Sequence, residues 1–187
     1  GLVEFGDTTK ISILPSSVKI NNEEWKIQEK VRINFREGKT TIENFDLSNS
    51  DQLLTVDGVI SKDSSDYIRV GFSEFDLKTV NPFTRTFGFN LGGKLNGKTD
   101  IYHILNKPRV VDEISIKDLV MNNNQVGDLT DNSTYDGISK KVEIYTKINR
   151  DGKETLSATG EVDLGEKQLD IDVDLDESQL VILEPFV

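Results

Sequence analysis

The chain has 187 residues, enough for one domain with a sizeable apolar core. Its 33 Asp and Glu outnumber its 22 Lys and Arg, and the net charge of −11 argues against nucleic acid as a partner, because phosphate backbones need clustered cations. There is no cysteine, which excludes disulfides, thiolate nucleophiles and cysteine-ligated zinc, and no apolar run reaches the roughly 18 residues of a membrane-spanning helix.

Alternation of apolar and polar residues dominates the chain, whereas helical periodicity is scarce. A first hairpin is predicted where Val18-x-Ile20 and Trp25-x-Ile27 flank a polar four-residue connection, Asn21-Asn22-Glu23-Glu24. The alternation predicts an all-β fold, a curved or wrapped antiparallel sheet with an apolar inner face and little helix.

A spaced apolar pattern then recurs three times, each copy in a strand-like run. The copies are Ile42-x-x-Phe45-x-Leu47, Phe72-x-x-Phe75-x-Leu77 and Ile116-x-x-Leu119-x-Met121. The first and third copies are both followed by an Asn two residues later, Asn49 and Asn123. Self-similarity of this kind is typical of a quasi-repetitive β architecture that stacks one unit on the next.

Further signals lie between the copies. Phe87, Phe89 and Leu91 are predicted to share one face of a strand, which Gly92-Gly93 interrupts as a bulge or bend. The remaining Asx-Gly pairs indicate turns or bulges and are Asp57-Gly58, Asn96-Gly97 and Asp136-Gly137.

Two stretches lack a clear strand pattern. We expect a short helix or a crossover loop over 98–112, and mostly loop over 122–133. Residues 1–187 are predicted to be a single β segment excised from a longer repetitive protein, with 1–97 and 113–187 as candidate subunits on either side of the irregular stretch. The opening Gly-Leu without Met supports this interpretation.

The last third contains a second hairpin, joined through Asn149-Arg150-Asp151-Gly152, and a two-faced strand. In that strand Leu169, Ile171, Val173 and Leu175 alternate with Asp170, Asp172, Asp174 and Asp176. Carboxylates suit calcium, but a straight row does not surround an ion and no EF-hand loop accompanies it. A solvated acidic face that discourages sheet stacking is the favoured interpretation, and no metal is predicted.

Catalytic constellations are thin. His103 is the only histidine and lies outside any Ser or Asp motif that would indicate a triad, so it is interpreted as structural. Nothing singles out a buried pair of carboxylates with a raised pKa. We therefore predict that the protein is not an enzyme and that it needs no cofactor.

A resemblance to the TamB family of envelope proteins, in its Bacteroidetes-type form, enters on a series of segments whose order carries the weight. They are Asn22-Glu23-Glu24-Trp25-Lys26-Ile27, Ile42-Glu43-Asn44-Phe45-Asp46-Leu47-Ser48-Asn49, Gln52-Leu53-Leu54-Thr55-Val56-Asp57-Gly58-Val59-Ile60-Ser61, Phe72-Ser73-Glu74-Phe75-Asp76-Leu77, Leu91-Gly92-Gly93-Lys94-Leu95-Asn96-Gly97, Ile114-Ser115-Ile116-Lys117-Asp118-Leu119, Val126-Gly127-Asp128-Leu129 and Leu183-Glu184-Pro185-Phe186.

The resemblance implies an internal or C-terminal-region fragment of a large AsmA-like bridge protein, anchored at the inner membrane and lying in the periplasm. Its repeated strands would form a long curved sheet with an apolar trough. The family suggests lipid transport between membranes and support of outer-membrane assembly, with an outer-membrane assembly protein as partner of the parent. Membrane contact would come only through that parent, and no catalytic residue is carried over.

The same function can be argued from the residues. If curvature leaves the apolar strand faces without a second layer, they form an open trough into which phospholipid acyl chains would fit. The predicted lining is Ile42, Phe45, Leu47, Phe72, Phe75, Leu77, Phe87, Phe89, Ile116, Leu119 and Met121. One alternative is a β-sandwich adhesion or scaffold module that binds protein or glycan through its loops. A carboxylate-dependent enzyme is the third hypothesis.

Overall fold

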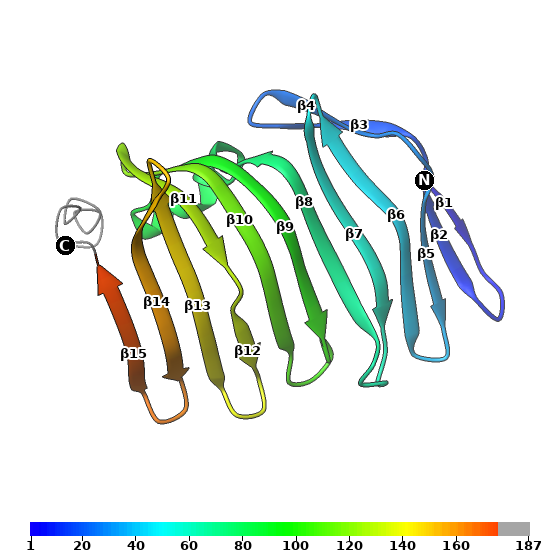
Figure 1. Cartoon of the computed structure of the whole chain (residues 1–187). Coiled ribbons are helices and arrows are strands. Elements are labelled where there is room, and N and C mark those ends of the chain that lie inside the picture. Colours follow the sequence, from blue (N-terminus) through cyan, green and yellow to red (C-terminus); the bar gives the residue numbers. More distant parts are fainter. Residues whose placement is uncertain (176–187) are drawn as a thin grey trace.

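The strands of the chain lie side by side in one antiparallel sheet of 15 strands, described by a computed structural model over residues 1–175 (Figure 1). The all-β prediction is confirmed. The strands are β1 (Leu2–Glu4), β2 (Thr9–Ile13), β3 (Ser16–Ile20), β4 (Glu23–Ile27), β5 (Val31–Arg36), β6 (Lys39–Asn49), β7 (Gln52–Ile60), β8 (Tyr67–Asp76), β9 (Leu91–Tyr102), β10 (Arg109–Met121), β11 (Asn124–Asp131), β12 (Thr134–Asp136), β13 (Lys141–Arg150), β14 (Lys153–Asp163) and β15 (Gln168–Leu175).

Most strands pair with their neighbours in sequence, as a meander does. The path runs β1-β2-β5-β6-β7-β8-β9-β10-β11-β13-β14-β15. The β3–β4 hairpin leaves this path and joins the sheet only where β4 meets β6, while the short β12 bridges β10 and β13.

Both predicted hairpins form, with tighter turns than expected. Asn21 and Asn22 have φ values of 52° and 68°, so two residues close the first turn and Glu23 already belongs to β4. Asp151 and Gly152, at 51° and 75°, close the second turn in the same way. Paired positive φ angles match the twist of the flanking strands and explain the preference for Asn, Asp and Gly.

Two stretches that lacked a strand pattern are mostly strand, so those predictions were wrong. The supposedly irregular 98–112 region belongs to β9 and β10, which pair along their length and are joined across 103–108. The expected loop over 122–133 contains β11. Continuous pairing through this region leaves no structural gap between the two candidate subunits. Inward polar residues such as Asp112 and Asp131 had hidden the alternation there.

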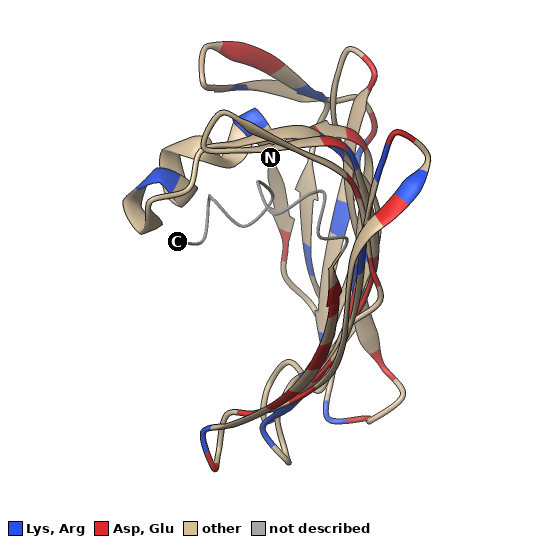
Figure 2. Cartoon of the chain, turned by 60° about the vertical axis from the view of Figure 1, so that its left-hand side comes forward, with Lys and Arg blue, Asp and Glu red and all other residues tan. Residues whose placement is uncertain are grey.

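The sheet is a single curved layer, and a short helical segment lies on its concave side (Figure 2). That segment comprises η1 (Leu77–Val80), α1 (Asn81–Thr84) and η2 (Arg85–Phe87). The Asp76 side chain caps η1, and a proline near the start of α1 presets helical backbone. No second sheet faces the first among the described residues, so the sandwich alternative is wrong in its architecture.

The buried apolar side chains form two adjacent groups. The Trp25 cluster contains Trp25, Leu47 and Phe75 at its centre, with Ile20, Ile27, Phe45, Leu54, Phe72, Val80 and Leu95 around them. The Leu119 cluster contains Leu77, Leu119, Val126 and Ile148, with Leu91, Leu95, Ile116, Met121, Leu129 and Leu156 around them. Together they make up what we call the capped region, because η1 and the β3–β4 hairpin contribute side chains to it.

Candidate functional site

Each copy of the repeated pattern contains a β-bulge. Between Ile42 and Phe45 the chain of β6 takes three steps against two on β7, from Gly58 to Val56. The same shift occurs on β8 against β9 and on β10 against β11. Apolar residues three apart on a regular strand would face opposite sides, and the extra residue returns them to the same side. The spacing therefore predicts a bulge, which the sequence analysis did not extract from it.

The bulges share one local geometry. Asn44, Glu74 and Asp118 occupy the same place in the three copies and have φ values of 59°, 48° and 51°. The backbone N–H of each donates to a side-chain oxygen of the next strand, at 2.8–2.9 Å. The three acceptors are Asp57, Asn96 and Asp128. These short polar side chains satisfy donors that the broken ladder would leave unpaired.

Glycines allow neighbouring strands to approach closely beside the bulges. A Cβ on Gly58 would lie 2.2 Å from the Tyr67 carbonyl oxygen, and one on Gly97 would lie 2.1 Å from that of Glu113. Both glycines also have positive φ, at 132° and 119°. Of the two interpretations offered for Asp57-Gly58 and Asn96-Gly97, the bulge interpretation is the one the structure supports.

The predicted lining residues fall into three groups. Eight belong to the capped region, and they are Phe45, Leu47, Phe72, Phe75, Leu77, Ile116, Leu119 and Met121. Trp25 packs on Phe75 with ring centroids 5.8 Å apart, and Phe72 packs on Phe75 at 5.7 Å. The repeated pattern thus brings its members together, but protein covers the innermost of them.

Phe87 and Phe89 are not on a strand, so that prediction was wrong. Phe87 ends η2 and is 78% exposed, and Phe89 follows it at 37% exposed. Pro82, which starts α1, and Gly88, whose φ of 86° ends η2, interrupt the extended backbone that alternation alone had suggested.

Ile42 belongs to a different feature, a line of directly opposed residues that crosses the whole sheet. We call it the transverse row. It runs through Val3, Ile11, Ile33, Ile42, Gly58, Ile68, Ile101, Val110, Tyr135, Val142, Val162 and Leu169. Opposed residues point to the same side of a sheet, so the row lies on the concave face with the capped region. At about 4.8 Å per strand, its length is roughly 50 Å.

The transverse row is less covered than the capped region. Nine of its residues are half-buried, and its two ends, Val3 and Leu169, are 53% and 71% exposed. Beyond neighbouring strands, the main contact with the sheet in the described chain is that of η1 with β9, near the capped region. The sequence analysis missed most of this row, although alternation within each strand had indicated its members singly.

A polar patch lies on the concave face between the transverse row and the capped region. Thr99 donates a hydrogen bond to Asp112, and Ser133 and Thr146 both donate to Asp131. Each carboxylate is held by hydroxyl groups of adjacent strands, which satisfies it within a largely apolar surface.

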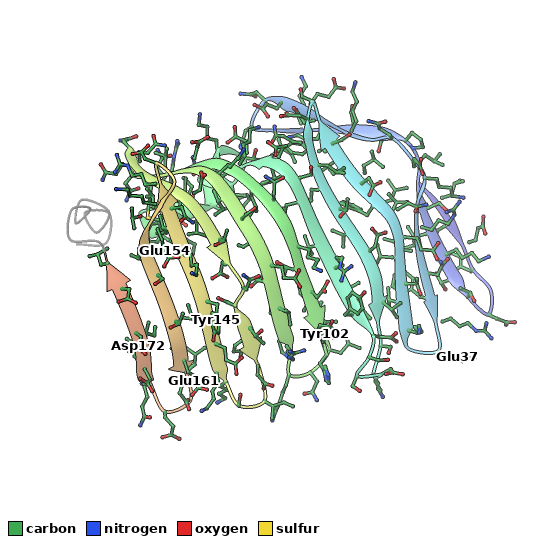
Figure 3. The ribbon with its side chains drawn as sticks, viewed as in Figure 1. Glu37, Tyr102, Tyr145, Glu154, Glu161 and Asp172 are labelled. Atoms are coloured by element: carbon green, nitrogen blue, oxygen red, sulfur yellow. The ribbon has the colours of Figure 1, made fainter. Side chains whose placement is uncertain are left out.

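The convex face is polar and carries the charged alternates of the strands. Tyr102, Tyr145, Glu161 and Asp172 lie on it (Figure 3). Arg69 donates two hydrogen bonds of 2.7 Å to Asp100, and this bonding raises the pKa of the Arg69 guanidinium above its usual value.

The aspartates of β15 are exposed on the convex face, as the solvated-face interpretation expects, and Asp176 lies outside the described residues. Over residues 1–175 no group of three or more His, Cys, Asp or Glu side chains is placed to hold a metal ion. None of the described helices is both long and apolar enough to cross a membrane.

Surface depressions do not coincide with the predicted lining. Five of them, with volumes of about 260 to 700 Å³, are lined mainly by polar side chains, and none includes any of the eleven predicted residues. An apolar ligand would therefore lie along the sheet surface or displace part of the capped region.

Comparison with protein-family models, with curated proteins and with solved structures found no match for this chain.

Proposed function

We propose that this protein binds lipid acyl chains along the concave face of its sheet and conducts them across the strands. The observation that carries the proposal is the transverse row, an apolar line about 50 Å long, at roughly 4.8 Å per strand, that reaches both edges of the sheet. Its half-buried side chains supply a continuous apolar surface without a fixed pocket.

The energetics suit sliding rather than tight capture. Each methylene shielded from water contributes on the order of 0.8 kcal/mol, while a headgroup can stay in solvent beside the row. Because the sites along the row differ little, a chain can move from one strand to the next without crossing a deep minimum. Such transfer requires no catalytic residue and no cofactor, and we propose a non-enzymatic role.

The wider setting of the proposal rests on the TamB resemblance. In that setting the segment lies in the periplasm as part of a longer envelope protein anchored at the inner membrane. It conducts phospholipid between the inner and outer membranes, supports outer-membrane assembly together with an assembly protein, or does both.

Photocrosslinking with matched positions tests the lipid proposal. We would place p-benzoylphenylalanine at Val142, on the transverse row, or at its neighbour Glu143, on the convex face. After irradiation with phospholipid vesicles, native mass spectrometry should detect lipid adducts at position 142 and at least fivefold fewer at position 143. Equal labelling at both positions, or none at either, would contradict the proposal. The second outcome would favour a module that binds protein or glycan through its surface.

A further inference from the structure

The β3–β4 hairpin is attached to the sheet by few contacts. β4 pairs with β6 at two register positions only, whereas β6 and β7 share eight. The other bonds that join the hairpin to the rest of the protein include those from Asn21 to the Thr79 carbonyl and from Asn49 to the Glu24 carbonyl, and they come from exposed side chains. A strand held so weakly can separate without disturbing the main ladder.

The hairpin is itself a complete unit. β3 and β4 pair over five register positions and close through the two-residue turn at Asn21 and Asn22. Short connections at Leu14-Pro15 and at 28–30 join it to β2 and β5. Because its internal bonds do not depend on β6, it can move as a body about these two connections.

Trp25 is the side chain that the hairpin inserts into the capped region. It is fully buried against Phe75 and Leu47, yet its indole N–H has no hydrogen-bond acceptor in the described part of the chain. Buried donors are nearly always paired, so this position is destabilised as it stands. The aromatic surface beneath Trp25 is apolar, and its outer members Phe45 and Phe72 are only half-buried.

We propose that Trp25 occupies a binding site for a hydrocarbon chain and that the β3–β4 hairpin is the gate of that site. When the hairpin swings away from β6, a lipid chain replaces the indole against Leu47, Phe72 and Phe75. The lipid then restores the apolar contacts that opening removes, while the freed indole N–H reaches water. This inference rests on the proposed function and identifies where on the concave face a chain is held.

The chain offers a sharp test because Trp25 is its only tryptophan and it has no cysteine. Lys26 and Ser48 are directly opposed across β4 and β6, at the 4.5–5.5 Å Cα separation of such pairs, which suits a disulfide. The double variant Lys26→Cys with Ser48→Cys closes the gate when oxidised, and the same protein after reduction is the matched control. Thermal unfolding of both forms verifies that they are folded.

The probe is a single-chain lysophospholipid and its counterpart brominated in the middle of the chain. We expect the wild type and the reduced variant to bind it by native mass spectrometry, with Trp25 emission quenched by the brominated form. The oxidised variant should bind at least tenfold more weakly and show no quenching. Equal binding by oxidised and reduced forms, without quenching, overturns the gate and leaves the proposed function standing. No binding by the wild type overturns both.

Discussion

The capped region and the transverse row belong to the same concave face, yet protein covers only one of them. In the capped region, η1 and the β3–β4 hairpin bury Trp25, Leu77 and Leu119 to 7% exposure or less. Along the transverse row the side chains are equally apolar but mostly half-buried. An apolar strand face therefore does not by itself indicate an open surface, because short additions to the sheet decide what is covered.

This difference also separates two roles for the repeated pattern. Its members mark the bulges and the side chains that fill the capped region, whereas the surface proposed to contact lipid is drawn from other positions on nearly every strand. Substitutions in the two regions should accordingly have different consequences, and the following experiments test that separation.

The largest effect is expected at the centre of the capped region. Phe75→Ala removes a ring that is 7% exposed and contacts both Trp25 and Phe72, so we expect the free energy of unfolding to fall by about 3–5 kcal/mol. Val142→Ala on the transverse row should lower it by about 1 kcal/mol or less. Urea denaturation measures both, and similar losses for the two variants would show that the regions do not differ in packing.

A glycine beside a bulge should come next. An alanine at Gly97 would place its Cβ 2.1 Å from the Glu113 carbonyl oxygen at a φ of 119°, so the sheet must shift. We expect Gly97→Ala to cost about 2 kcal/mol or more. Gly6→Ala is the control, since a Cβ there meets nothing closer than 3.9 Å, and it should be nearly neutral. If Gly97→Ala also proved neutral in urea denaturation, close strand approach would not be needed at the bulge.

A gain in stability is expected at a bulge whose residue fits poorly. Glu74 has a φ of 48°, in a region that Asn tolerates better, and the equivalent residue of the first copy is Asn44. Glu74→Asn should raise the free energy of unfolding by about 0.5 kcal/mol, because the bond from its backbone N–H to Asn96 is kept. Asn44→Glu should produce a loss of similar size. Changes of the same sign in both variants would contradict the shared geometry.

Much of the fold could be predicted from alternation and turn residues, including both hairpins, the two-faced final strand and the all-β class. The errors have physical causes. Asp112 and Asp131 point into the concave face and are satisfied by hydroxyl groups of other strands, so β9 to β11 were taken in part for irregular chain. Phe87 and Phe89 alternate like a strand, but Pro82 and Gly88 define a helical turn around them.

The candidate site was harder to predict than the fold. Membership of the transverse row depends on cross-strand register, which the bulges change from one strand pair to the next. A single sequence shows which residues of a strand share a face, but not which residue lies opposite on the neighbouring strand. The cover supplied by Trp25 likewise depends on where the β3–β4 hairpin leaves the main path of the sheet.

The smallest effect is expected on the convex side of β6. Burial, together with the charges of Asp57 and Glu29, raises the pKa of Asp46 above its usual value of 3.8. Between the unfolded and folded pKa values the native state binds more protons than the unfolded chain, so this residue makes stability fall as pH rises through that window. Asp46→Asn removes the buried charge and should stabilise the protein at pH 7 by about 0.3 kcal/mol, a size typical of partly exposed charges. At pH 3, where the carboxyl group is mostly protonated in both states, the difference between variant and wild type should disappear. Urea denaturation at the two pH values measures it, and a gain that is as large at pH 3 as at pH 7 would mean that shape or hydrogen bonding, not charge, governs this position.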